Sequence, residues 1–127
     1  MTFGPVPAYQ VPTWIAADRL LRLVGITGTP TAAQQERAGL VVAQVNVGIA
    51  RVLDRPDPAF DPVVLAGWPD LEAAAATAAQ YAYRRFDTAF DTVGYADLTG
   101  AAIKVARDAL AYVAPQLERW RRVGGIG

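Results

Sequence analysis

The feature that most constrains this chain is an alanine-rich segment at residues 69–86, which reads PDLEAAAATAAQYAYRRF. Alanine has the highest helix propensity, and a proline in the first helical turn forfeits no hydrogen bond. Asp70 and Glu72 lie at the end where the helix dipole favours negative charge. Arg84 and Arg85 lie at the end where it favours positive charge. Local preferences alone therefore predict a helix over this segment.

The apolar face of this expected helix is flat, because it consists mostly of methyl groups. Its members are Ala75, Ala78 and Ala82, with Leu71 and Phe86 at the two ends. Such a face lets another backbone come close but contributes little hydrophobic burial of its own. We expect it to lie on the long helix at residues 31–53, of this chain or of a neighbouring copy.

Two further helices are predicted upstream of this segment. Residues 13–24 form a short amphipathic pattern, for which Thr13 is the expected N-cap. Thr31 and Gln34 have the spacing of a capping box, and the helix that they open runs to about Leu53. This second helix is the longest expected in the chain and is apolar on most sides, which is typical of a helix buried on most sides.

Two glycines, Gly39 and Gly48, lie inside the longest expected helix. Each costs about 1 kcal/mol relative to alanine in a helix interior. A side chain at these positions would keep a neighbouring helix away. We therefore expect close approach of another helix to compensate at both glycines.

Prolines divide the rest of the chain. Residues 54–68 contain three prolines and are expected to form a loop tied down onto the core. The apolar residues of 101–114 recur with a spacing that predicts a helix. Pro115 should interrupt this helix, and residues 116–122 should form a short separate one. A short β segment near residues 88–105 is an additional expectation. The predicted fold is mainly α: a small bundle of three to five helices with long loops and extended terminal arms.

At 127 residues the chain is long enough for one domain. We expect a helical domain at residues 13–114 and a C-terminal arm at residues 115–127. Residues 1–12 contain three prolines, which favour extended conformations over a helix. This segment is either a disordered terminus or an apolar arm that becomes ordered on a neighbouring subunit.

The composition restricts the classes of function. Apolar residues make up 53% of the chain and charged residues only 19%, which suggests surface buried against other chains. No apolar run is long enough for a membrane helix, and the first residues do not resemble a secretory signal. The 12 basic and 12 acidic residues cancel. General nucleic-acid binding is therefore not expected. A local contact between the chain and DNA stays compatible with this charge in an assembly that encloses the DNA.

The side chains that most often carry catalysis are scarce. The chain has no histidine and no cysteine, which removes the commonest general base and most zinc sites. Asp54, Asp57 and Asp61 are expected to be turn residues rather than ligands of a divalent cation. Asp87 and Asp91 are expected to be loop or cap residues rather than a pair of hydrolase carboxylates. We therefore expect no enzymatic activity, no metal and no cofactor.

Clusters of aromatic and basic residues indicate a protein interface instead, because Tyr, Trp and Arg are enriched among interface hot spots. A nucleic-acid platform would need more positive charge around these clusters. For Tyr81 and Trp120 the alternative is that they complete the core. The candidate interface residues are Tyr9, Trp14, Tyr81, Tyr83, Arg84, Arg85, Leu117, Arg119, Trp120, Arg121 and Arg122.

The order of elements carries a family resemblance. A short amphipathic helix (WIAADRLLRLVGI), a polar turn and a long apolar helix ending at residues 51–55 come first. A proline-rich loop follows, then the alanine-rich helix that starts at a proline and ends in QYAYRR, and a closing QLERWRR. This order, over most of residues 13–122, resembles the head-to-tail connector (adaptor) proteins of long-tailed bacteriophages. The proline-rich N-terminal arm and the unusually apolar second helix depart from the family pattern.

The resemblance implies a structural virion protein without catalytic activity. Such proteins form a cyclic ring, usually of twelve copies, that sits between the portal of the phage head and the next connector or tail protein. DNA passes through the lumen without sequence-specific binding, and the subunit is made in the bacterial cytoplasm. Trp120 would then be a candidate anchor on a neighbour or on the portal. The alternative is a small helical oligomeric binding or regulatory module unrelated to virions.

Overall fold

The computed structural model describes residues 11–55, 57–93 and 98–121, with the backbone alone described at 87–93 and 98–99. These residues form five α-helices, α1 (Ala17–Leu23), α2 (Ala32–Leu53), α3 (Pro62–Ala66), α4 (Trp68–Val93) and α5 (Leu98–Glu118). The mainly α prediction is confirmed. The described part of residues 88–105 is helical, so the predicted β segment is wrong there. The alanines around the β-branched residues of this stretch favour a helix, and packing overrides the weak strand preference.

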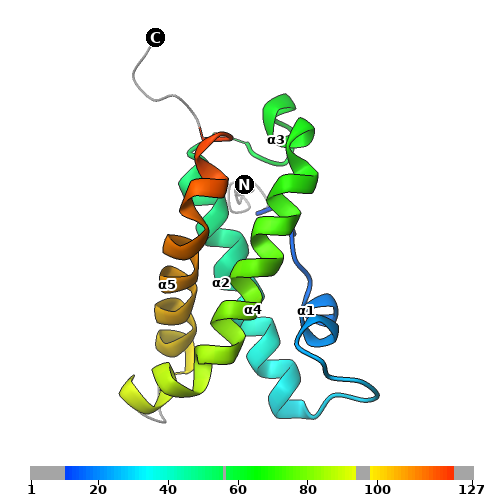
Figure 1. Ribbon diagram of the computed structural model, residues 1–127, viewed down its shortest axis with the longest axis vertical. Helices are drawn as coiled ribbons and strands as arrows, with labels where there is room; N and C mark the ends of the chain where they lie inside the picture. The colour runs from blue at the N-terminus through cyan, green and yellow to red at the C-terminus, as the bar shows by residue number, and fades with distance from the viewer. Residues whose placement is uncertain (1–10, 56, 94–97, 122–127) are drawn as a thin grey trace, which may run out of the picture.

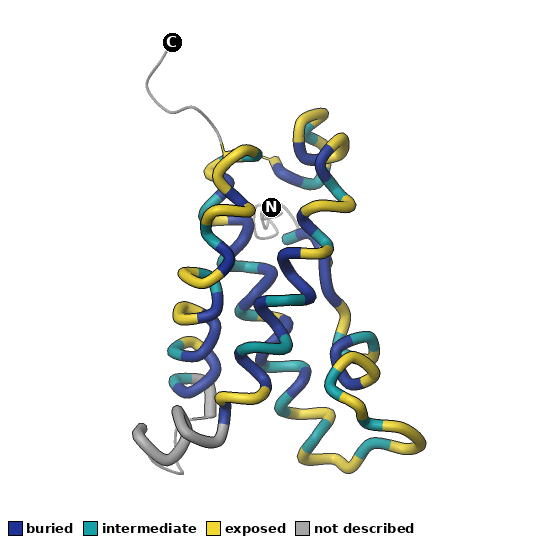
Figure 2. The backbone as a smooth tube through the Cα atoms, in the orientation of Figure 1, coloured by how far each residue is buried: buried dark blue, intermediate teal, exposed yellow. Residues whose placement is uncertain are grey.

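Three long helices make up the bundle. In Figure 1, α4 crosses in front of α2, with α5 on one side and α1 on the other. Helix α4 contacts α1, α2, α3 and α5, and α5 is its most extensive partner. Figure 2 shows that the buried residues of the long helices face one another, whereas α3 and the connection from α1 to α2 are largely exposed.

The alanine-rich helix packs as its flat face predicts, but on two partners. The alanines at 74, 75, 78, 79 and 82 of α4 are fully buried, as are those at 101, 102 and 109 of α5. Methyl groups on both helices keep the separation of their backbones small. The expected contact with α2 of the same chain is present, and α5 covers more of the face than α2 does.

The two glycines of α2 differ in their surroundings. A Cβ added at Gly48 would collide with the side chain of Leu110 from α5, so the predicted close approach is confirmed there. No described residue of the chain lies within 4 Å of a Cβ added at Gly39, so the same prediction is wrong for that position. The capping box at the start of α2 is confirmed, because the backbone N–H groups of Thr31 and Gln34 each donate to the other residue's side chain, at 2.9 and 3.1 Å.

Helix α1 begins later than predicted because the chain before it is bound to α2. Its N-cap is Ala16, which makes no side-chain capping bond, and not Thr13. The backbone N–H groups of Trp14 and Ile15 donate to Oδ1 of Asn46, at 3.0 and 3.2 Å. Nδ2 of the same Asn46 donates to the carbonyl of Ile15 at 3.0 Å. Asn46 is buried in α2 and thus satisfies three buried backbone groups of the segment that precedes α1.

Pro115 does not interrupt α5, which corrects the prediction of a break and a new short helix. The helix continues to Glu118 with Pro115 inside it. A proline removes one helical hydrogen bond and crowds the preceding turn. Val113 and Leu117, on either side of Pro115, are fully buried against the core. We attribute the continuity of α5 to this packing, which offsets the lost hydrogen bond.

Residues 54–68 are held on the core through the buried Val64 of α3 and the partly buried Trp68. The expectation of a loop held on the core is met there, although the segment contains a short helix that was not predicted. Phe60 and Leu65, in the same segment, are exposed. No helix in the described part of the chain is both long enough and apolar enough to cross a bilayer.

Candidate protein interface

Helix α3 is held in place by Asp61, its N-cap. The carboxylate Oδ1 accepts hydrogen bonds from the backbone N–H groups of Val63 at 2.9 Å and Val64 at 3.4 Å. Pro62 occupies the first helical turn, where its missing N–H costs nothing. Asp61 thus bonds nearby backbone groups, as predicted for a turn residue, and it also caps a helix that was not predicted.

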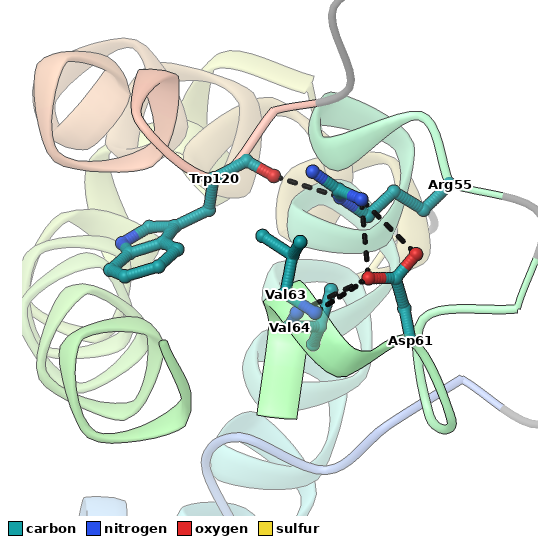
Figure 3. Close-up of polar contacts among 5 residues, drawn as sticks. All are labelled: Arg55, Asp61, Val63, Val64 and Trp120. Carbon is teal, nitrogen blue, oxygen red and sulfur yellow. Dashed lines mark hydrogen bonds and ion pairs between the residues drawn. The ribbon is translucent and has the colours of Figure 1, made fainter. Parts of the chain in front are cut away.

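Arg55 joins this cap to the end of α5 (Figure 3). Its Nη1 lies 3.1 Å from each of the two carboxylate oxygens of Asp61, and its Nε donates to the backbone carbonyl of Trp120 at 3.0 Å. The side chains of Arg55 and Asp61 are only 15% and 19% exposed, so water screens this pair less than it screens an ordinary surface ion pair. One guanidinium thus ties the end of α2 and the start of α3 to the end of α5, 65 residues further along the chain.

The surroundings of Asp61 also change its acidity. Burial raises the pKa of this carboxyl, but hydrogen bonds from Arg55, Val63 and Val64 and the positive charge of Arg55 lower it. The net effect is a pKa below the ordinary value of 3.8. The carboxylate therefore stays ionised, and the cap stays in place, over the whole neutral range.

Trp120 covers Gly67, the residue between α3 and α4. A Cβ added at Gly67 would lie 2.6 Å from atoms of the Trp120 ring, so only glycine allows this contact. The indole Nε1 of Trp120 is buried without a hydrogen-bond partner. In this chain Trp120 packs on the core and fastens the end of α5 to the α3–α4 junction.

The segment from Phe60 to Leu65 exposes three apolar side chains. Phe60 is 77% exposed, Val63 40% and Leu65 52%. We call these three side chains the α3 ridge. Residues 54–68 were expected to form a loop held on the core, so the exposure of these side chains was not predicted. Val64 takes the inward position of α3, and Val63 and Leu65 lie about 100° to either side of it around the helix axis.

A second surface lies where α4 and α5 meet. The rings of Tyr81 and Tyr112 stack with centroids 5.1 Å apart, and the guanidinium of Arg85 lies 3.8 Å from the centroid of Tyr81. They border a hollow of about 340 Å³. Its lining residues, which we call the Tyr–Arg hollow, are Thr77, Gln80, Tyr81, Arg84, Arg85 and Tyr112.

The predicted interface residues fall into separate groups. Tyr81, Arg84 and Arg85 come together in the Tyr–Arg hollow, and Tyr112 joins them from α5. Tyr112 was not among the predicted interface residues. It lies three residues after the buried Ala109 and directly before the buried Val113. Helical spacing alone therefore does not show that its side chain faces solvent.

Three of the predicted residues are buried inside this chain. Trp14, Tyr83 and Leu117 belong to the core, and Trp14 packs on Trp68 with ring centroids 5.4 Å apart. This corrects the expectation that they are available to a partner. Aromatic and leucine side chains are as typical of cores as of interfaces, so residue type alone does not separate the two.

The remaining predicted residues lie near the end of α5 or outside the described residues. Arg119 is exposed and stacks on the Trp120 ring at 5.0 Å from its centroid. Arg121 is also exposed and pairs with Glu118 at 3.6 Å. Tyr9 and Arg122 lie outside the described residues.

Three further features of the surface bear on what the chain could contact. Among the side chains described at residues 11–55, 57–86 and 100–121, no three of the His, Cys, Asp or Glu types come together as potential metal ligands. An apolar pocket of about 540 Å³ lies beside α1 and is lined in part by Leu21, Ile26 and Pro30. Phe60 of the α3 ridge and the Tyr and Arg residues of the Tyr–Arg hollow are of types enriched in interfaces.

Comparison of the chain with protein-family models, with curated proteins and with solved structures found no match.

Proposed function

We propose that this chain is a structural subunit of a phage virion, which assembles into a ring connecting the portal of the head to the tail. The observation that carries the proposal is the pair of unlike contact surfaces, the α3 ridge and the Tyr–Arg hollow, on one packed helical unit. A subunit with two different, complementary surfaces can associate head to tail, and such contacts form a ring where the rotation between neighbours closes. The order of helices that resembles the connector family adds to this support.

The charge of the chain is compatible with this role. A ring around a DNA path must not bind the DNA so tightly that passage stops. The chain carries 12 basic and 12 acidic residues, so it lacks the basic excess that drives non-specific DNA binding. We propose the portal and the next connector or tail protein as its partners at the head–tail junction of the virion, with DNA passing through the lumen.

The second candidate, a dimeric binding or regulatory module, has less support. That hypothesis uses the apolar faces of the helices predicted at residues 31–53 and 69–86, which correspond to α2 and α4, for dimerisation. In this structure the alanine face of α4 is buried against α2 and α5 of the same chain. A dimer through these faces would require the bundle to open.

The proposal is tested by co-expressing the chain with the portal protein encoded nearest to its own gene. Light scattering after size-exclusion chromatography measures the mass, and electron microscopy shows the symmetry. We expect rings of this chain seated on the portal. A chain that stays monomeric or dimeric at every concentration, and that never joins the portal, would overturn the proposal.

A further inference from the structure

The α3 ridge and the Tyr–Arg hollow differ in charge as well as in shape. Asp57 is exposed, and its backbone carbonyl accepts a hydrogen bond from the N–H of Phe60 at 3.1 Å, so one turn carries both side chains. Arg84 and Arg85 are exposed in the hollow, and no ion pair joins either of them to another described residue. An acidic and aromatic ridge therefore faces outward on one side, and a basic and aromatic hollow on another.

We propose that the occupant of the Tyr–Arg hollow is the α3 ridge of a second copy of this chain. This inference rests on the proposed function and deepens it by naming the two surfaces that meet around the ring. Phe60 would pack on the exposed ring of Tyr112, which is 62% exposed, and Asp57 would approach Arg84 and Arg85. Aromatic pairs of this kind contribute about 0.5–1.5 kcal/mol beyond the area that they bury.

The two surfaces are separate on the chain. Tyr81 follows Trp68 by thirteen residues on α4, which corresponds to about 20 Å along the helix axis. Figure 1 shows α3 at the end where α4 begins, whereas the hollow lies between α4 and α5. Two separate surfaces allow head-to-tail association, in which a copy whose ridge fills a neighbour's hollow leaves its own hollow for the next copy, and the proposed ring requires this arrangement.

The size of the ridge indicates a weak pairwise contact. Stable interfaces bury about 1,200–2,000 Å² in total, and a single aromatic side chain buries about 150–250 Å². Three exposed apolar side chains and one carboxylate fall short of that area. We therefore expect monomers in dilute solution, with assembly at high concentration or where a portal gathers several copies.

Cross-linking tests this contact directly, because the chain has no cysteine to give a background. Ala66→Cys places a thiol on the exposed part of α3, and Thr77→Cys places one in the hollow, with Phe60 and Tyr112 retained. The two variants, one carrying a tag for identification by mass, are mixed at about 1 mM and oxidised briefly. At that concentration a contact with a Kd of about 1 mM is substantially occupied. The control replaces Thr77→Cys with Ala33→Cys, which is exposed at the far end of α2.

We expect the Ala66→Cys and Thr77→Cys chains to cross-link faster than the control pair. Asp57→Lys on the ridge chain, or Arg84→Glu on the hollow chain, should slow this cross-linking about two- to fivefold, and the two changes together should restore it. Glu36→Lys, at an exposed position of α2, should leave the rate unchanged. Equal rates for the test and control pairs would overturn the inference, as would a charge reversal that no second change rescues.

The two proposals fail in different ways. Rings on the portal together with cross-linking no faster than the control would retain the connector function and remove the ridge-in-hollow contact. The same result would assign the ridge to the portal or to another partner. Specific cross-linking without rings on the portal would retain the contact between copies and overturn the connector function.

Discussion

Asn46 offers the sharpest test of how this chain is held together. Replacing it with alanine removes a buried side chain that makes three hydrogen bonds with the backbone of Trp14 and Ile15. The three backbone groups then lie in a buried position without their partner. Because the segment before α1 is joined to α2 through this side chain, Asn46→Ala should loosen that segment more than the rest of the bundle.

The magnitude follows from the number of bonds. A hydrogen bond contributes about 1 kcal/mol net, so Asn46→Ala should lower the free energy of unfolding by about 3 kcal/mol. A domain is stable by about 5–15 kcal/mol, so this loss is a large share of the total. For a chain of this size it corresponds to a fall in Tm of about 10 °C.

Urea denaturation followed by circular dichroism measures the loss, and hydrogen exchange locates it. The amides of Trp14 and Ile15 should lose protection, whereas amides in the middle of α4 should change only as much as the global stability does. Gln35→Ala, at an exposed position on the same helix, is the matched control and should change the stability by less than about 0.5 kcal/mol. A loss below about 1 kcal/mol for Asn46→Ala, with both amides still protected, would refute the reasoning.

Three further predictions concern glycines and acidity. Gly39→Ala should raise the free energy of unfolding by about 0.5–1 kcal/mol, because the added methyl meets open space in a helix interior. A lower free energy of unfolding in urea denaturation would contradict this prediction. Gly67→Ala should lower it by about 1–3 kcal/mol, since the methyl displaces the ring of Trp120, and an unchanged urea midpoint would show that this contact is loose. The folded-state pKa of Asp61 lies below its ordinary value of 3.8, so its stabilising effect is complete above that pH and is lost as the pH falls through the folded-state pKa. The stability difference between the parent chain and Asp61→Asn should therefore shrink in acid, and a difference that is constant from pH 7 down to pH 2 would exclude this linkage.

Much of the helical structure was predictable because it depends on residues close together in the sequence. The capping box of Thr31 and Gln34, for example, joins residues only three positions apart. The alanine-rich segment is helical by intrinsic propensity, and its flat face indicates close packing. The boundaries were less predictable, since the late start of α1 and the passage of α5 through Pro115 both depend on distant contacts.

The candidate interface was predictable only in part. The Tyr and Arg residues near the end of the alanine-rich segment were singled out by type, and Tyr81, Arg84 and Arg85 do line one hollow. Tyr112 could not be assigned to it, because the stacking on Tyr81 arises from the packing of α5 on α4. The ridge was hidden for a related reason, since the contact of Val64 with the core decides which neighbours face outward.

By itself, the sequence determined that the chain forms a mainly helical fold with its long helices near residues 31–53, 69–86 and 101–114, because propensity, capping and charge near helix ends act over a few residues. It also determined that the chain lacks the histidine and cysteine chemistry of many enzymes. Only the tertiary structure decided which polar and aromatic groups are used internally. Asn46 binds residues 31 and 32 positions away, and Arg55 reaches the carbonyl of a residue 65 positions away. Such pairings depend on how the helices pack, and no local pattern of residue types records that packing.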